Sequence, residues 1–377
     1  MNILILHASA GNGHRRAAEA LARAFENDSR THRIAVCDIL DYTPSIFRTT
    51  YAKGYLRLVR HIPELWGYMY AVLDRKGQVP WRRKVRATFN RINAAGFFDF
   101  YSELSPDAVI CTHFMPLELM ATSSRRRRQN VPVFGVITDF AVHSLWVDAN
   151  VEAYYVATEE AARQMIRRGQ PQTGTVVSGI PIDPVFVQTR DKTFAREQLG
   201  IKPDIPTVLI LSGGFGVGPT IELLRSFNSY QSSLQLLVVA GANKELEKKA
   251  NLTAEELNLW VYVYGFVNNI DLMMDACDLV VSKPGGLTSS EVLAKGKPMV
   301  IVDPIPGQEQ RNCEYLLERG AAVRLFEVED APCKIGNLLN NPARLTAMAN
   351  AAAHAGHPAA AQEIVEDIKL RVAGAAE

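Results

Sequence analysis

The chain has 377 residues, 47% of them hydrophobic and 21% charged, and a formal net charge of +1. This length exceeds what one hydrophobic core usually serves, so two domains of fewer than about 200 residues each are expected. No stretch reaches the roughly 18–20 uninterrupted apolar residues of a membrane-spanning helix. The five cysteines lack the paired spacing of a zinc site or a disulfide framework. Residues 1–6 are typical of a first strand and not of a signal peptide, which predicts a cytoplasmic globular protein.

Charge is distributed unevenly along the chain. Residues 1–178 hold 23 Lys and Arg against 16 Asp and Glu, a net +7, whereas the remainder holds 18 against 24, a net −6. Between Arg48 and Arg91 there are 11 basic and two acidic residues, interleaved with aromatic side chains such as Trp66 and Trp81. This mixture suits an anionic membrane surface, and suits single-stranded nucleic acid less well, because no RNA-binding signature accompanies it. The competing interpretation is a helical insertion whose aromatic side chains fill the core of the domain and whose arginines are solvated.

A strand, a glycine turn and a helix start are predicted for residues 278–291. The segment opens with an apolar run typical of a buried strand, and Gly285 and Gly286 then permit a tight turn. Thr288 or the following serine can cap a helix that carries Glu291 in its first turn. The unpaired N–H groups of such a helix start suit a phosphate, and a nearby carboxylate suits ribose hydroxyls. The pattern indicates a nucleotide site, although any strand-to-helix turn can contain two glycines.

Two further loops in this half follow predicted strands. Residues 212–219 hold four glycines ahead of a helix, among them Gly214 and Gly216. Such a loop suits a diphosphate, and it lacks the Lys-Ser/Thr ending of an ATPase phosphate loop. Gln308 and Glu309 follow another predicted strand, at the edge where open α/β sheets bind ligands. Their amide and carboxylate groups suit sugar hydroxyls.

The amino-terminal half presents a comparable loop after its first predicted strand. Gly11 and Gly13 would let the backbone approach a substrate, and His14 lies where the loop turns into a helix. An imidazole in this place can take a proton from an alcohol near neutral pH, but local sequence alone favours a helix cap. Asp139 and His143 follow another predicted strand, where they either line a pocket or form a structural hydrogen bond with each other.

Four of these stretches together resemble one family of glycosyltransferases. They are Gly-Asn-Gly-His-Arg-Arg-Ala-Ala-Glu-Ala at 11–20, Thr-Asp-Phe-x-x-His-x-x-Trp at 138–146, Ser-Lys-Pro-Gly-Gly-Leu-Thr-Ser-Ser-Glu at 282–291, and Gly-Gln-Glu at 307–309. The family contains monogalactosyldiacylglycerol synthases and processive diacylglycerol glucosyltransferases. More distantly, the chain is similar to the lipid-linked N-acetylglucosaminyltransferase of peptidoglycan synthesis. The resemblance extends over nearly the whole chain.

The resemblance, with the alternation of strands and helices, implies an α/β fold of the GT-B type. Two Rossmann-like domains would face each other across a cleft. Residues 1–185 would form an acceptor- and membrane-facing domain, and residues 186–377 a UDP-sugar-binding domain. Residues 330–353 are predicted to be helical and Ala-rich. A last helix at 362–372 is expected to pack back on the first domain.

The activity that the resemblance implies is inverting transfer of galactose or glucose from a UDP-sugar to diacylglycerol. The product would be a glycolipid, made at the cytoplasmic face of the cell membrane. By this match His14 is the candidate general base, and Asp139 and His143 line the acceptor side. The other implied contacts are Gly11 and Gly13 near the substrates, Gly214, Gly216, Gly285, Gly286 and Thr288 at the diphosphate, Glu291 at the ribose, Gln308 and Glu309 at the hexose, and Phe266 and Val267 at the uracil.

Other functions stay open at this point. A UDP-sugar transferase to another lipid acceptor is the closest alternative, and a UDP-sugar epimerase or hydrolase and a noncatalytic nucleotide-sugar-binding protein are more distant ones. No metal or other cofactor is expected, because no Asp-x-Asp motif is present, although a divalent cation could stimulate the reaction. The expected partners are a UDP-hexose, a diacylglycerol-type lipid and an anionic membrane surface, without nucleic acid. Glucose and galactose differ at one stereocentre, which the sequence does not distinguish.

Overall fold

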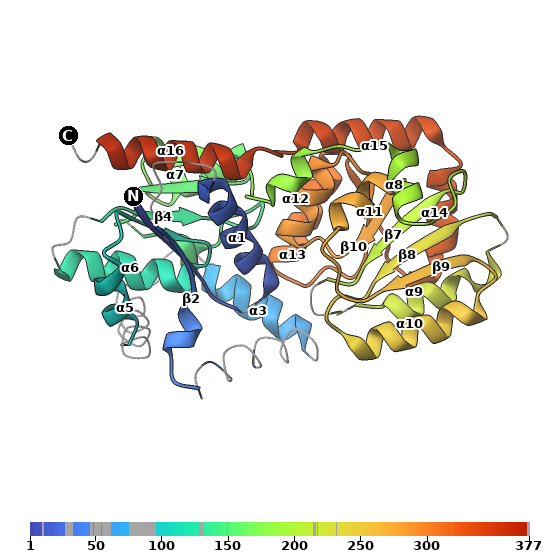
Figure 1. The fold of residues 1–377 in the computed structure, drawn as a ribbon, viewed down its shortest axis with the longest axis horizontal. Coiled ribbons are helices and arrows are strands. Elements are labelled where there is room, and N and C mark those ends of the chain that lie inside the picture. Colours follow the sequence, from blue (N-terminus) through green and yellow to red (C-terminus); the bar gives the residue numbers. More distant parts are fainter. Residues whose placement is uncertain are drawn as a thin grey trace. The chain divides into compact units, whose positions relative to one another are not determined.

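The computed structural model describes residues 1–9, 11–26, 33–45, 48, 54, 62–74, 96–127, 131–148, 150–213, 216, 218–230 and 232–374, with the backbone only at 122–127. These residues form two compact units (Figure 1). Unit 1 consists of Met1–Pro184, Pro306–Gln308 and Ala359–Glu377, and unit 2 consists of Val185–Ile305 and Glu309–Pro358.

Unit 1 is built on a six-stranded parallel sheet with the strand order β2-β1-β3-β4-β5-β6. Its strands are β1 Asn2–His7, β2 Arg33–Asp38, β3 Ala108–Cys111, β4 Val133–Val136, β5 Ala153–Val156 and β6 Thr175–Val177. Strands β3, β4 and β5 are buried along their whole length, as expected of a parallel sheet covered on both faces. Because all strands run the same way, the loops that follow the neighbouring strands β1, β3 and β4 meet at one edge.

Helices cover both faces of this sheet. The described helices of unit 1 are α1 Asn12–Glu26, α3 Pro63–Asp74, α5 Phe97–Leu104, α6 Phe114–Arg127, α7 Glu159–Arg167 and α16 Ala360–Gly374, with 3-10 turns η1 Ile39–Tyr42, η2 Ser144–Trp146 and η3 Gln172–Gly174. One core contains Leu21 and Phe25 of α1 together with Ile364 of α16. A second core contains Phe97 of α5 and Trp146 of η2, along with residues of α6 and α7. The helix predicted to follow the loop at His14 is therefore present, and its apolar side chains Leu21 and Phe25 lie in the first of these cores.

The C-terminal helix returns to unit 1, which confirms the predicted packing. Helix α16 lies against α1 (Figure 1). The carboxylate of Asp367 accepts hydrogen bonds from Tyr155 Oη and Arg371 Nε, each at 2.7 Å. Burial, followed by the effect of Asp367, raises the pKa of Tyr155, so the phenol stays a neutral donor. The last helix thus completes the core of unit 1 although it follows unit 2 in the sequence.

Unit 2 is built on a second six-stranded parallel sheet with the order β12-β11-β10-β7-β8-β9. Its strands are β7 Thr207–Leu211, β8 Gln235–Val239, β9 Trp260–Tyr264, β10 Leu279–Ser282, β11 Met299–Ile301 and β12 Ala322–Arg324. Its helices are α8 Lys192–Gln198, α9 Thr220–Ser226, α10 Lys244–Glu256, α11 Ile270–Ala276, α12 Gly286–Ala294, α13 Gln308–Glu318, α14 Ala331–Leu339 and α15 Pro342–Ala355, with 3-10 turns η4 Pro184–Val187, η5 Phe227–Ser229 and η6 Val328–Asp330. The strands predicted in this half are all present.

The prediction that residues 330–353 are helical is confirmed. Two helices, α14 and α15, occupy this range and are separated at Asn340 and Asn341. Pro342 begins α15 because a proline has no N–H with which to continue α14. The side chain of Asn341 caps α15 by accepting a hydrogen bond from the backbone N–H of Arg344 at 3.0 Å.

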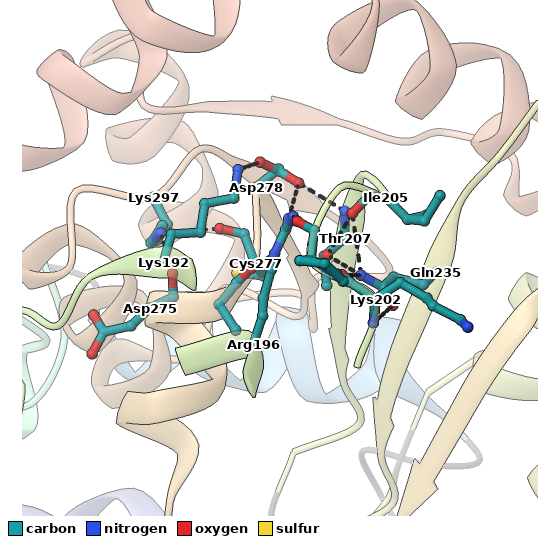
Figure 2. Close-up of polar contacts among 12 residues, drawn as sticks. Lys192, Arg196, Lys202, Ile205, Thr207, Gln235, Asp275, Cys277, Asp278 and Lys297 are labelled. Carbon is teal, nitrogen blue, oxygen red and sulfur yellow. Dashed lines mark hydrogen bonds and ion pairs between the residues drawn. The ribbon is translucent and has the colours of Figure 1, made fainter. Parts of the chain in front are cut away.

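A polar network holds α8 against the amino edge of the unit 2 sheet (Figure 2). The carboxylate of Asp278, just before β10, accepts hydrogen bonds from Arg196 Nη2 at 2.9 Å and from the backbone N–H of Thr207 at 2.7 Å. It also pairs with Lys192. Gln235 donates to Thr207 Oγ1 at 2.8 Å, which joins the start of β8 to the start of β7. This network lies at the opposite end of the strands from the loops predicted to bind the donor, so its role is to stabilise the unit.

Candidate active site

The carboxyl edge of the unit 1 sheet brings together residues from three loops. His14 lies in the first turn of α1, while Thr112 follows β3 and Thr138 follows β4. His14 Nδ1 lies 2.7 Å from the carbonyl oxygen of Thr112 and 2.9 Å from Thr138 Oγ1. Thr112 Oγ1 donates a hydrogen bond to the carbonyl oxygen of His14 at 2.8 Å. The imidazole is therefore fixed by two neighbouring strands.

These contacts determine which nitrogen of His14 carries the proton. A carbonyl oxygen can only accept, so Nδ1 donates to Thr112, and in the neutral ring Nε2 keeps its lone pair. Burial lowers the pKa of His14, and the opposing effects of Asp139 and of the Thr112 carbonyl offset this only in part. Near neutral pH the ring is thus a neutral base with its accepting nitrogen at Nε2.

The other residues predicted around His14 lie at the same edge. Asp139 is half-buried after β4 and is close enough to His14 to raise its pKa. Gly13 lies in the first turn of α1 beside His14. A Cβ added to Gly11 would meet no atom of the described residues within 4 Å, so its position is open on that side. The structure therefore brings Gly11, Gly13, His14 and Asp139 together, and their roles stay predictions.

Two histidines that were not predicted from sequence lie beside His14. The ring of His113 meets that of His14 edge-on, with centroids 4.6 Å apart, and its Nδ1 accepts a hydrogen bond from the N–H of Met115 at 3.0 Å. His7, the last residue of β1, is buried, and its Nδ1 has no hydrogen-bond partner in the described part of the chain. Burial is the main cause that lowers the pKa of both rings. Their places at the ends of two adjacent parallel strands were the signal that could have identified them.

His143 is held by hydrogen bonds at both ring nitrogens. Its Nδ1 accepts from the backbone N–H of Leu145 at 3.1 Å, and its Nε2 donates to the carbonyl oxygen of Tyr70 at 3.0 Å. Its ring also packs on that of Tyr70, with centroids 4.2 Å apart. Because Nε2 donates, it has no lone pair with which to accept a proton, which favours a positioning role for His143.

The same region fastens the end of α3 to unit 1. Ser144 donates from its hydroxyl to the carbonyl oxygen of Leu73 and from its backbone N–H to Asp74 Oδ1, each at 2.7 Å. Arg168 Nη2 donates to the same carboxylate at 3.0 Å. Together with the bond from His143 to Tyr70, these contacts satisfy carbonyl groups in the last turn of α3. The helix is thus anchored at its carboxyl end.

Helix α3 exposes apolar side chains, among them Leu65, Met69 and Tyr68, the last of which is 65% exposed. This helix is the part of the basic and aromatic segment 48–91 that the structure describes in detail. Arg48 is also described, and it pairs with Asp41 at 3.0 Å. The other basic residues of the segment lie outside the described residues, namely Lys53, Arg57, Arg60, Arg75, Lys76, Arg82, Arg83, Lys84, Arg86 and Arg91. The membrane-facing role of the segment stays a prediction.

The predicted strand, turn and helix of residues 278–291 are present in unit 2 as β10, a loop and α12. The helix begins at Gly286 with Gly285 as its N-cap, so the predicted cap at Thr288 was wrong. Glycine has no side chain to cap the first N–H groups, which leaves them for an anion. Glu291 lies beyond the first turn, contrary to prediction, and is only 2% exposed.

The glycine-rich loop follows β7 in the neighbouring position of the sheet. Gly213, Gly216 and Gly218 have positive φ angles of 71°, 58° and 148°, a region that side chains disfavour. A Cβ on Gly216 would also lie 2.6 Å from the Cβ of Asn243, so no larger residue fits there. Gly214 lies outside the described residues.

A lysine that was not predicted joins these two loops. Lys283 lies between β10 and α12, and a Cβ added to Gly218 would be 3.3 Å from its Cε. Its ammonium pairs with Asp303 at 2.6 Å, and the lysine side chain is 17% exposed whereas that of Asp303 is 58% exposed. Asp303 has a φ of 42°, an unusual conformation for a residue with a side chain. The signal in the sequence was a cation directly before a glycine turn and a helix start.

Helix α13 brings a carboxylate to the same loop. Glu309 Oε2 accepts a hydrogen bond from the N–H of Ile305 at 2.8 Å, and its Oε1 would lie 3.9 Å from a Cβ on Gly285. Asn312 Nδ2 donates to the carbonyl oxygen of Pro284 at 3.0 Å. Gln308 is the first residue of α13 and groups with unit 1. The predicted set at Gly285 and Glu309 is therefore brought together within unit 2.

Phe266 and Val267 follow β9, the edge strand of the same sheet. The ring of Phe266 is 69% exposed, and Val267 is partly buried.

Among the described residues, no three His, Cys, Asp or Glu side chains are grouped as a metal site would require. In the same part of the chain, no helix has the length and apolar character needed to cross a bilayer.

Comparison with known protein families identifies two matching regions. Residues 14–182 match the family Monogalactosyldiacylglycerol (MGDG) synthase, and residues 207–364 match the Glycosyltransferase family 28 C-terminal domain. A relative from Bacillus mycoides (strain KBAB4), named Processive diacylglycerol beta-glucosyltransferase, is 29% identical over 97% of this chain and 92% of its own. A relative of the same name from Bacillus pumilus (strain SAFR-032) is 28% identical over 97% and 94%.

Two solved structures with the same fold have low sequence identity to this chain. MurG of Acinetobacter baumannii is 17% identical and superposes with a TM-score of 0.64 over 97% of this chain and 98% of its own. HepE of Anabaena, solved with UDP and glucose, is 17% identical with a TM-score of 0.56 over 98% and 99%. At this identity the likeness establishes the fold, which is of the GT-B type.

Proposed function

Since the chain belongs to the monogalactosyldiacylglycerol synthase family of glycosyltransferases, we propose that it transfers a hexose from a UDP-sugar to diacylglycerol. The names of the Bacillus relatives support diacylglycerol as the acceptor and glucose as one candidate sugar. The observation that carries the proposal is the state of His14, whose Nδ1 donates to Thr112 and whose Nε2 is therefore a base. A noncatalytic sugar-nucleotide-binding protein would have no use for that arrangement.

In this reaction His14 Nε2 removes the proton from the acceptor hydroxyl. The hydroxyl oxygen attacks the anomeric carbon of the hexose, and the bond from that carbon to the diphosphate oxygen breaks. UDP leaves with the electron pair of that bond, and the proton ends on His14. Attack from the face opposite the leaving group inverts the anomeric configuration. Asp139, which raises the pKa of His14, also favours the imidazolium that forms.

Unit 2 supplies the groups that suit the departing diphosphate. We assign Lys283, the N–H groups at the start of α12 and the glycine loop at Gly216 to this role, because each offers positive charge or backbone donors. In this scheme the ammonium of Lys283 offsets the negative charge of the departing diphosphate, so no bound metal is required. Gln308 and Glu309 are assigned to hexose hydroxyls. The remaining donor contacts are assigned to Glu291 at the ribose and to the backbone of Phe266 and Val267 at the uracil.

Unit 1 would accordingly bind the acceptor lipid and the cytoplasmic face of the membrane. The exposed apolar side chains of α3 can enter the interface, and the basic residues of the same segment suit anionic headgroups. The anchoring of the last turn of α3 by His143 and Ser144 would keep this surface in place. Unit 2 would bind the UDP-hexose.

The proposal is tested by transfer of radiolabelled sugar from UDP-glucose and UDP-galactose, in parallel, to diacylglycerol in mixed micelles. Labelled glycolipid with either donor is expected, and its formation should depend on His14. UDP binding without any labelled product would overturn diacylglycerol as the acceptor. Labelled product with a polyprenyl-linked acceptor instead would identify the alternative transferase, and conversion of the UDP-sugar itself would identify an epimerase or hydrolase.

Membrane attachment is tested separately by sedimentation with phosphatidylglycerol vesicles. Tyr68→Ser should weaken binding several-fold, whereas Leu252→Ser, which removes an exposed apolar side chain on α10 of unit 2, should not. Equal binding by both variants and the unchanged protein would show that α3 is not the membrane surface.

A further inference from the structure

Unit 2 contains a cavity of about 370 Å³ that shares no residue with the proposed donor site. It lies beside the edge strand β12, between the end of α13 and the helices α14 and α15. Its wall is mostly apolar and includes Leu317, Val323 and Leu338. A volume of this size falls within the range of small-molecule sites, about 300–1,000 Å³.

The polar part of this wall is cationic. Arg324, Lys334 and Arg344 line the cavity, and no Asp or Glu lines it with them. Within the described part of the chain, none of the three forms an ion pair, and Arg324 Nε is buried with no hydrogen-bond partner. A buried donor without a partner is costly, so this wall favours an anion.

One aromatic ring contacts two of these three cations. Phe326, which is 74% exposed, has the guanidinium of Arg324 5.1 Å and the ammonium of Lys334 5.6 Å from its ring centroid. Lys334 also donates to the backbone carbonyl oxygen of Arg324 at 2.6 Å, which holds the two cations close together. Neither the ring nor the carbonyl carries a full negative charge, so an acidic group beside them would be attracted to both cations.

We propose that this cavity binds a single-chain anionic amphiphile. Its carboxylate or phosphate would pair with Arg324, Lys334 and Arg344, and its apolar chain would fill the space beside Leu317 and Leu338. A planar guanidinium suits either acid, since both present paired oxygens. Neither the apolar wall nor the three cations alone explains the site, but an amphiphile matches both.

Binding of radiolabelled dodecanoate to the full chain is measured by equilibrium dialysis, at dodecanoate concentrations below the micellar limit. Dodecanoate and dodecyl phosphate should each bind with saturation, whereas dodecanol and inorganic phosphate should bind at least tenfold more weakly. The ratio of the two affinities shows whether the site prefers a carboxylate or a phosphate. Equal binding of dodecanol would overturn the role of the cations, and equal binding of inorganic phosphate would overturn the role of the apolar wall.

Variants locate the binding in this cavity. Asn337 is an exposed residue that lines it, so Asn337→Glu should place a repelling charge there and lower affinity at least tenfold, while Asn337→Ala should not. Arg344→Gln should weaken binding several-fold, whereas Lys248→Gln, the same loss of charge on an exposed position of α10, should leave it unchanged. UDP binding serves as the check on folding. No saturable dodecanoate binding, or equal binding by Asn337→Glu, would overturn the proposal.

Discussion

Both sheets are parallel and six-stranded, but the chemistry at their carboxyl edges differs. In unit 1 the edge consists of side chains that fix one another, with His14 bound to Thr112 and Thr138 and packed on His113. In unit 2 it consists mainly of backbone, with glycines at positive φ, a helix start without a side-chain cap and one lysine. A parallel sheet supplies the position of a site, and the residue types decide whether that site moves a proton or binds an anion.

The two edges should therefore respond differently to substitution. A base is fixed by a few hydrogen bonds, so its loss should abolish turnover and leave donor binding intact. An anion site shared among several backbone groups should lose only part of its affinity with each substitution. Loss of the charged side chain of Lys283 should be the exception.

The largest effect is expected from His14→Ala. Loss of a general base costs about 10²–10⁴-fold in turnover, and UDP affinity should stay unchanged because the contacts assigned to UDP lie in unit 2. Initial rates of glycolipid formation and calorimetric titration with UDP measure the two quantities. The matched control is His143→Ala, whose ring is occupied at both nitrogens; it should lose less activity than His14→Ala. A His14→Ala enzyme with normal turnover would show that the base lies elsewhere.

A smaller effect is expected from Lys283→Met, which removes the one charge at the unit 2 edge that we assign to the diphosphate. Removing a donor that stabilises developing charge costs about 10²–10³-fold in turnover, and UDP affinity should fall as well. Lys283→Arg keeps the charge and should recover part of the activity. Asp303→Asn removes the carboxylate that pairs with Lys283 and should strengthen UDP binding, because the ammonium no longer has that competitor. Weaker UDP binding by Asp303→Asn would contradict the role of Lys283.

The same comparison shows what could be read from the sequence. Apolar runs, glycine turns and the alternation of strands and helices predicted both sheets, and the resemblance predicted the return of α16. The tautomer of His14 could not be predicted, because it depends on Thr112, which is 98 residues away in the chain. The helix start at Gly286 was missed because Thr288 is the better cap by residue type, while the extended backbone of Gly285 decides the boundary. Lys283 was overlooked because its neighbour Asp303 belongs to a different strand end.

A still smaller loss is expected from Gly216→Ala in the glycine loop. A side chain at a φ of 58° costs about 1–2 kcal/mol, and the new Cβ would press on Asn243. Thermal unfolding should show a larger loss of stability than the φ angle alone would cause, because Asn243 and the carbonyl of Ala240 must shift. Titration should show weaker UDP binding, with turnover at saturating donor little changed. Gly200→Ala is the matched control, since its φ is also positive, at 65°, but nothing lies within 4 Å of its Cβ. Equal UDP affinity of the two variants would separate the loop from the donor site.

The smallest effect is a shift in pH dependence on Asp139→Asn. His14 acts as a base in its neutral form, so kcat/KM should rise with pH through the pKa of His14, which burial lowers. The carboxylate of Asp139 raises that pKa, whereas the neighbouring ring of His113 carries no charge near neutral pH because burial keeps its own pKa well lowered. Replacing Asp139 by its neutral isostere should therefore lower the pKa of His14 further and move the acid limb of the profile to lower pH. The pH profile of kcat/KM for the two proteins measures the shift. An acid limb that stays in place, or moves to higher pH, would mean that Asp139 does not raise the pKa of His14 through its charge.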